Sequence, residues 1–118
     1  MSFGKYFRNL RKTKQVTQKQ LAEAIGKTPM LISGIETDKN GPFSDEDLAV
    51  ISKYMDLSDA EYADLQICAS SARGKLPRHI ADYMAGQKEV YSLLEVLANN
   101  NMDENSLKRI KAYAEDIK

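Results

Sequence analysis

The chain has 118 residues, 42% hydrophobic and 29% charged, which is material for one domain or for a small domain with an appendage. Its 17 basic and 17 acidic side chains cancel, which excludes a polycation that coats nucleic acid and an acidic tail protein. The single cysteine, Cys68, excludes an intrachain disulfide. The sequence has neither the apolar core of a signal peptide nor roughly 20 successive apolar residues, which favours a cytoplasmic protein with no membrane partner.

Helix-start signals are clear in the first half of the chain, and no hairpin signals or β-branched runs compete with them, so the sequence predicts an all-α fold. Thr17 and Gln20 form a capping box, and Pro29 follows Thr28 at a first helical position, where its missing N–H costs nothing. The predicted helices cover about residues 2–14, 18–25 and 29–37, then continue from caps at Ser44 and Ser58 to about residues 55 and 72.

The segment from Gly74 to Pro77 is the predicted domain boundary, because Gly74 supplies a left-handed helix end. It separates a first domain, residues 1–73, from a helical extension, residues 74–118. We expect helices over about residues 77–85, 87–98 and 104–117, the last of them capped by Asp103. The extension is small but rich in apolar residues at helical spacing, so it needs a surface to cover it. That surface is either the first domain or a second chain.

Two short helices joined by the turn Gly26, Lys27 and Thr28 have the proportions of a helix-turn-helix, although an αα-hairpin in any small bundle has them too. The string TQKQLAEAIGKTPMLISGIE, Thr17 to Glu36, resembles the helix-turn-helix of the XRE family, which contains the lambda-type repressors and Cro proteins. The resemblance covers about residues 3–57. It implies a lambda repressor-like five-helix domain that binds double-stranded DNA. The extension resembles those of some phage or mobile-element regulators.

Charge is unevenly distributed along the neutral chain. Residues 1–40 carry an excess of five positive charges, and the remainder carries an excess of five negative charges. This asymmetry fits a polyanion-binding face at the amino-terminal end, and it also fits an ordinary solvated helix surface.

A helical projection of residues 28–37 separates an inner face from an outer face at about 100° per residue. Thr28, Ile32, Ile35 and Glu36 are predicted to point to the core. Met30, Ser33, Gly34 and Thr37 are predicted to point outward, and together with Thr28 and Leu31 they are the expected groove contacts. Family members often carry long polar side chains there, whereas Met30 offers only apolar contacts, such as with a thymine methyl, and Gly34 has no side chain. The alternative is that Met30 and Leu31 are exposed for a protein partner.

Phosphate contacts are expected at the start of the helix over residues 18–25, where backbone N–H groups and the helix dipole suit an anion. The expected contacts there are Thr17 and Gln18, and the resemblance places Gln18 where it reaches both backbone and base. Further phosphate contacts are predicted at Lys19, Lys27, Lys39 and Asn40. The resemblance also implies that Arg11 and Glu36 form a buried or half-buried ion pair with a structural role.

Enzymatic function is not expected from this inventory. His79 is the only histidine, the six glycines form no phosphate-binding loop, and no nucleophile elbow or metal-ligand cluster is present in the sequence. We therefore predict no catalytic residue, no cofactor and no metal. The predicted function is a sequence-specific repressor that acts as a homodimer on a two-fold operator. The alternatives are an antitoxin-like autoregulator whose extension binds a partner protein, and an interaction module that has lost DNA binding.

Overall fold

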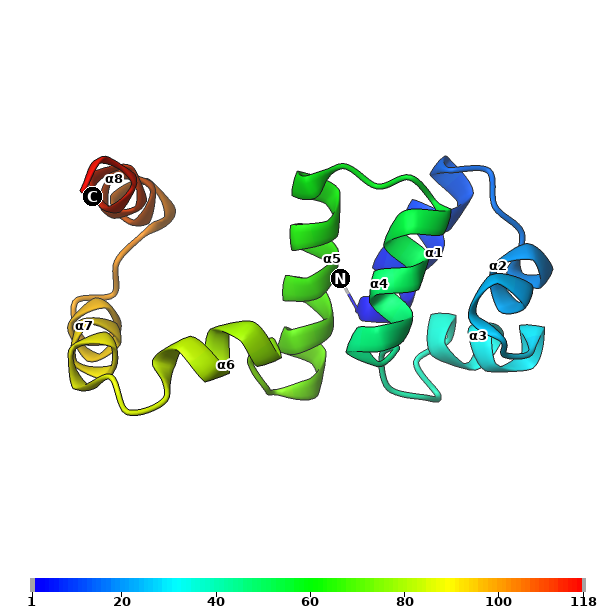
Figure 1. The fold of residues 1–118 in the computed structure, drawn as a ribbon, viewed down its shortest axis with the longest axis horizontal. Coiled ribbons are helices and arrows are strands. Elements are labelled where there is room, and N and C mark those ends of the chain that lie inside the picture. The colour runs from blue at the N-terminus through cyan, green and yellow to red at the C-terminus, as the bar shows by residue number, and fades with distance from the viewer. Residues whose placement is uncertain (1, 118) are drawn as a thin grey trace. The chain divides into compact units, whose positions relative to one another are not determined.

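A computed structural model describes residues 2–117 and contains eight α-helices and no β-strand within that range (Figure 1). The helices are α1 (Phe3–Thr13), α2 (Gln18–Ile25), α3 (Pro29–Glu36), α4 (Asp45–Tyr54), α5 (Asp59–Arg73), α6 (Arg78–Met84), α7 (Lys88–Asn99) and α8 (Glu104–Asp116). The prediction of an all-α fold is confirmed, and the helix bounds differ from the expected ones by about one residue.

Side-chain caps explain where the helices begin. In six helices the N-cap side chain accepts a hydrogen bond from the backbone amide three residues later; these N-caps are Ser2, Thr17, Thr28, Ser44, Ser58 and Asp103. The capping box is complete in α2, where Gln20 Oε1 also accepts a hydrogen bond from the Thr17 amide at 2.9 Å. Each such cap is worth about 1 kcal/mol, and its residue types are visible in the sequence.

The helix ends are less regular than the sequence indicates. Gly26 and Gly74 end α2 and α5 in the left-handed conformation, as expected. Four residues that are not glycine adopt the same conformation after other helices: Gln15, Asp38, Asp56 and Asn101. At each of them the following amide donates to the carbonyl five residues back, which is the Schellman pattern. The sequence predicted where these four helices end to within about one residue, but not their left-handed conformation, because they lack glycine.

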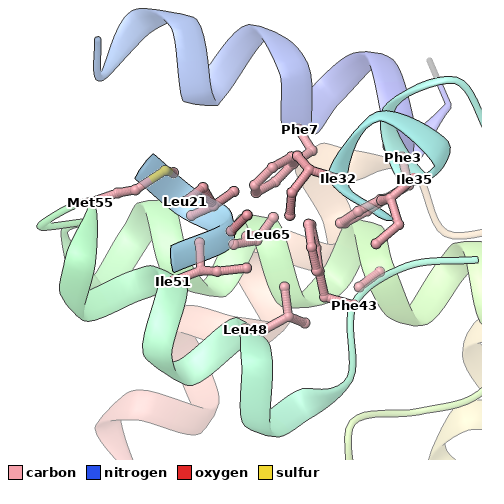
Figure 2. Packing of buried hydrophobic residues seen from close by; sticks show 12 residues of the cluster. Phe3, Phe7, Leu21, Ile32, Ile35, Phe43, Leu48, Ile51, Met55 and Leu65 are labelled. Carbon is pink, nitrogen blue, oxygen red and sulfur yellow. The ribbon is translucent and has the colours of Figure 1, made fainter. Parts of the chain in front are cut away.

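A single core cluster holds α1 to α5 together (Figure 2). Packed helix pairs join α1 to α3 and α5, α2 to α3 and α4, and α4 to α5. Phe43 enters this core from the loop after α3, and its ring centroid lies 4.7 Å from that of Phe7 in an edge-on contact. The helical periodicity does not reveal Phe43, because the residue lies outside every helix.

The described chain divides into two compact units, one ending at Arg78 and the other beginning at His79. The division lies slightly beyond the predicted boundary after Arg73, and Leu76 and Pro77 line a hollow together with residues of α5. In the second unit, neither α7 nor α8 buries a residue. Large apolar side chains are exposed on both helices: Tyr91, Leu93, Leu94, Val96, Leu107 and Tyr113. Within residues 2–117, no helix has both the length and the apolar character needed to cross a membrane.

Candidate nucleic-acid interface

The helices α2 and α3 are joined by a turn that the sequence builds from local rules. Gly26 has a φ of 67°, and a Cβ added there would meet nothing within 4 Å, so this glycine is needed for its conformation rather than for space. Buried Leu21 of α2 and buried Ile32 and Ile35 of α3 lie in the common core. Their burial fixes the rotation of α3 about its axis, so the opposite face of α3 meets solvent.

The outward face of α3 brings together most of the predicted groove residues. Met30 is 82% exposed and stands at one side of a hollow of 310 Å³. The hollow is lined by Met30, Ser33, Gly34, Thr37, Lys39 and Asn40. All six residues lie within about two helical turns or in the loop that follows, so a ligand that approaches this face would meet them together. Their contact with DNA stays a prediction.

Two of the expected orientations on α3 are wrong. Thr28 was expected to face the core, but it is exposed, and its hydroxyl accepts a hydrogen bond from the Leu31 amide at 3.2 Å. The helical projection fails there because Thr28 is the N-cap, with extended backbone angles. Leu31 was expected to be exposed, but it is half-buried and packs against the core. Of the two apolar residues, only Met30 is fully available to a ligand.

A buried ion pair connects the first and third helices, as the resemblance implied. Arg11 Nε donates to Glu36 Oε2 at 2.6 Å and Arg11 Nη2 donates to Glu36 Oε1 at 2.9 Å, with the two side chains 8% and 2% exposed. Arg11 Nη1 also donates to the Val16 carbonyl at 2.8 Å. The planar guanidinium therefore has partners on both edges, and it holds α1, α3 and the segment before α2 in fixed positions.

The start of α2 has fewer uncommitted donors than expected. Gln18 Nε2 donates to Glu36 Oε1 at 3.1 Å, so the side chain predicted to reach backbone and base is tied to the buried ion pair. The Thr17 amide donates to Gln20, and therefore the expectation of an unsatisfied N–H at Thr17 is wrong. Gln18 Nε2 keeps a second N–H that Glu36 does not use, and Lys19 is exposed, so this helix end keeps donors that can meet a phosphate.

The carboxyl end of α3 is anchored by two residues that sequence reasoning missed. The backbone amide of Gly4 donates to Asp38 Oδ1 at 3.0 Å. A Cβ at Gly4 would lie 2.5 Å from the Glu36 carbonyl and 2.6 Å from the Ile35 carbonyl, so the absence of a side chain allows α1 to approach α3. A carboxylate at the start of α1 also suits the helix dipole. Only the pairing in space shows this role, because a glycine near a chain start carries no signal of a close contact.

Internal ion pairs reduce the basic surface that the charge count suggested. Besides Arg11, Lys14 is engaged, since its ammonium lies 3.0 Å from Glu61 on α5. The exposed basic residues of the first forty are Lys5, Arg8, Lys12, Lys19, Lys27 and Lys39. Lys27 lies in the turn and Lys39 follows α3, so the predicted phosphate contacts flank the outward face of α3.

Three groups on α1 and α5 have shifted pKa values. A backbone hydrogen bond from Ser58, followed by the hydrogen bond from Lys14, lowers the pKa of Glu61. Burial, and then the negative charge of Asp64, raise the pKa of Tyr6, while burial raises the pKa of the Cys68 thiol. None of these groups lines the hollow on α3.

Comparison with known families matches residues 2–65 to the family described as helix-turn-helix domain. The match covers more than half of the chain and includes α1 to α4 with the start of α5. No curated protein and no solved structure matches the chain. The resemblance carried by residues 17–36 to helix-turn-helix regulators is thereby confirmed.

Proposed function

The chain belongs to the family described as helix-turn-helix domain. Because helix-turn-helix motifs place their second helix in the DNA major groove, we propose that the protein is a sequence-specific transcriptional regulator of the XRE and Cro type. In this proposal the protein is a cytoplasmic repressor of phage or mobile-element origin, and it has no catalytic activity. The helix α3 enters the major groove, and the repressor acts by occupying an operator that polymerase needs.

The observation that carries this proposal is the outward face of α3. It presents Met30, Gly34 and Thr37 on a short helix whose rotation is fixed by a buried core and by the ion pair of Glu36. The exposed Lys27 and Lys39 flank this face and supply charge for phosphates. A rigid helix with a solvent-facing surface and basic neighbours is the arrangement that major-groove binding requires.

We propose further that the protein is a homodimer held together through its carboxy-terminal helices. A two-fold operator requires two recognition helices about 34 Å apart, and a closed dimer supplies them. The support is the apolar surface of α7 and α8, which bury no residue within the described chain. Exposed Leu93, Leu94 and Leu107 lose contact with water when a second copy covers them.

The same surface favours one second candidate, an antitoxin-like autoregulator. In that case α7 and α8 bind a different protein, while the helix-turn-helix represses the operon that encodes both. The supporting observation is again the exposed apolar surface on helices that do not form part of the first core.

Selection of bound sequences from a random double-stranded DNA pool tests the proposal. A palindromic motif with half-sites one helical turn apart supports a dimeric regulator. A stable protein that co-purifies with the chain, in addition to the motif, identifies the antitoxin-like candidate. If no sequence is enriched, the chain is an interaction module without DNA binding, and the proposal is wrong.

A further inference from the structure

The residues of α3 itself offer little for reading bases. Met30 is apolar and Gly34 has no side chain. The hydroxyl of Thr37 donates to the carbonyls of Ser33 at 2.9 Å and Gly34 at 3.3 Å, so its proton is committed to the helix backbone. Ser33, which also lines the hollow, offers a single hydroxyl. A bidentate contact with a base at this face therefore needs a polar group from outside α3.

Asn40, in the loop after α3, occupies the space that a side chain at position 34 would fill. Its Nδ2 lies 2.5 Å and its Cγ 3.3 Å from the position of a Cβ added at Gly34. The backbone amides of Lys39 and Asn40 both donate to the Gly34 carbonyl, at 2.9 and 3.1 Å. This turn follows Asp38, whose φ of 63° reverses the chain and whose carboxylate is bound by the Gly4 amide. These hydrogen bonds fix the backbone of Asn40 at the end of α3, and its side-chain amide lies over Gly34 in the middle of the helix.

We propose that Asn40 is the base-reading residue of this protein and that it recognises an adenine in the major groove. A side-chain amide carries one acceptor and one donor group that match the N6 donor and N7 acceptor of adenine. This inference rests on the proposed DNA-binding function and replaces the earlier expectation that Asn40 contacts a phosphate. The hollow that Asn40 lines with Met30 is the surface that faces the base edges.

The surroundings of Asn40 favour a base over a phosphate. Within residues 2–117 its side-chain amide has no hydrogen-bonding partner, so both its donor and its acceptor are available. A phosphate accepts hydrogen bonds and is repelled by the oxygen of the Asn40 amide. The adjacent Lys39 carries a full positive charge and is the better phosphate ligand of the two. Met30 lies one turn before Gly34, about 6 Å along the helix axis. An apolar contact with a thymine methyl therefore falls within two base-pair steps of the adenine.

Gly34 acts as a positioning residue in this arrangement. An alanine there would place its Cβ against Asn40 Nδ2, and the amide would have to shift because it is the movable partner. Alanine is a better helix former than glycine, so the substitution should leave the fold intact. Gly34→Ala therefore displaces the reading group without removing it.

The test combines selection from a random DNA pool with competition binding for the full-length wild type, Asn40→Ala and Gly34→Ala. We expect the wild-type motif to contain an adenine in each half-site whose replacement weakens binding by about ten-fold or more. In Asn40→Ala and Gly34→Ala this preference should fall to about two-fold or less, while the other positions of the motif keep theirs. Lys39→Ala, the phosphate control, should weaken all sequences alike. Gly41→Ala, whose Cβ would meet nothing within 4 Å, controls for a glycine replacement in the same loop.

Thermal melting separates recognition from folding, since both variants should melt no more than a few degrees below the wild type. If Asn40→Ala weakens every sequence equally and leaves the motif unchanged, Asn40 is a phosphate contact and the inference is overturned. It is also overturned if the motif contains no position that responds to Asn40. If the wild type enriches no sequence, the proposed function itself fails, and the inference fails with it.

Discussion

Replacement of Glu36 by glutamine should destabilise the first unit strongly. The substitution keeps the size of the side chain and removes its charge, which leaves the Arg11 guanidinium buried beside a neutral amide. Both side chains are almost inaccessible to water, at 8% and 2% exposure. Glu36 also accepts a hydrogen bond from Gln18, so the change affects contacts that join α1, α2 and α3.

The expected cost follows from the burial of the pair. Removing one partner of a buried ion pair costs about 3 to 5 kcal/mol, and glutamine, which keeps one acceptor, should fall near the lower end. A loss of about 3 kcal/mol lowers the melting temperature of a domain of this size by about 12 to 24 °C. It is also a large share of a total stability of about 5 to 15 kcal/mol. Thermal and urea denaturation followed by circular dichroism measure both quantities.

A matched control is available in the Lys14–Glu61 pair, whose side chains are 26% and 36% exposed. Glu61→Gln makes the same chemical change at an accessible position and keeps the capping box with Ser58, so it should cost much less than Glu36→Gln. Adding Arg11→Met to Glu36→Gln should restore part of the lost stability, because the orphaned charge is removed. If Glu36→Gln shifts the melting temperature no further than Glu61→Gln does, the reasoning about the buried pair is refuted.

Four further predictions follow from the same contacts. DNA binding should weaken by about three orders of magnitude between 50 and 200 mM salt if a dimer makes about six phosphate contacts. Lys39→Ala removes one of these contacts from each protomer, so it should reduce the slope of log K against log salt by about two. Fluorescence anisotropy measures both quantities, and a flat salt response would falsify the DNA-binding role. Gly4→Ala should cost about 1 to 3 kcal/mol in urea denaturation, because its Cβ meets two backbone carbonyls of α3, whereas Gly41→Ala, in open space, should cost much less. A chain cut after Arg78 contains the complete first core, so it should stay folded, become monomeric and bind one half-site weakly. Sedimentation measures the oligomeric state. An intact protein that is monomeric, or a fragment that is dimeric, contradicts the proposed role of the carboxy-terminal helices. The pKa of Glu61 is lowered in the folded protein, chiefly by a backbone hydrogen bond. The stabilisation by its carboxylate is therefore present at neutral pH and lost as the pH falls through that lowered pKa. Glu61→Gln should lack this pH-dependent part of the stability, and identical acid melting curves for the wild type and Glu61→Gln contradict the prediction.

The helices and the helix-turn-helix could be predicted because their signals are local. A cap such as Thr17 or Ser58 acts on an amide three residues away, and Pro29 acts at its own position, so a single sequence contains both partners of the interaction. The inward face of α3 was also predicted correctly at Ile32 and Ile35, since helical periodicity depends only on spacing. The projection failed at Thr28, where the backbone is no longer helical.

The contacts that sequence analysis missed join residues far apart in the chain. Phe43 enters the core from a loop, where no periodicity marks it. Gly4 and Asp38 are 34 residues apart, and their hydrogen bond exists only because α1 and α3 already pack together. The charge count missed the pair of Lys14 with Glu61 for the same reason, and it therefore overstated the basic surface.

The outward face of α3 shows how such long-range contacts shape the surface that we propose for recognition. In the sequence, Gly34 leaves the outward face of α3 without a side chain at that position, which argues against direct readout of bases there. In the structure, the missing side chain of Gly34 leaves space that the Asn40 side chain occupies. The left-handed conformation of Asp38 turns the chain so that Asn40 lies against α3. Asp38 is held in turn by the amide of Gly4 at the start of α1. Under the proposed role of Asn40, the contact between α1 and α3 supports base recognition as well as stability, so a substitution at Gly4 that leaves part of the fold intact should also disturb the base preference.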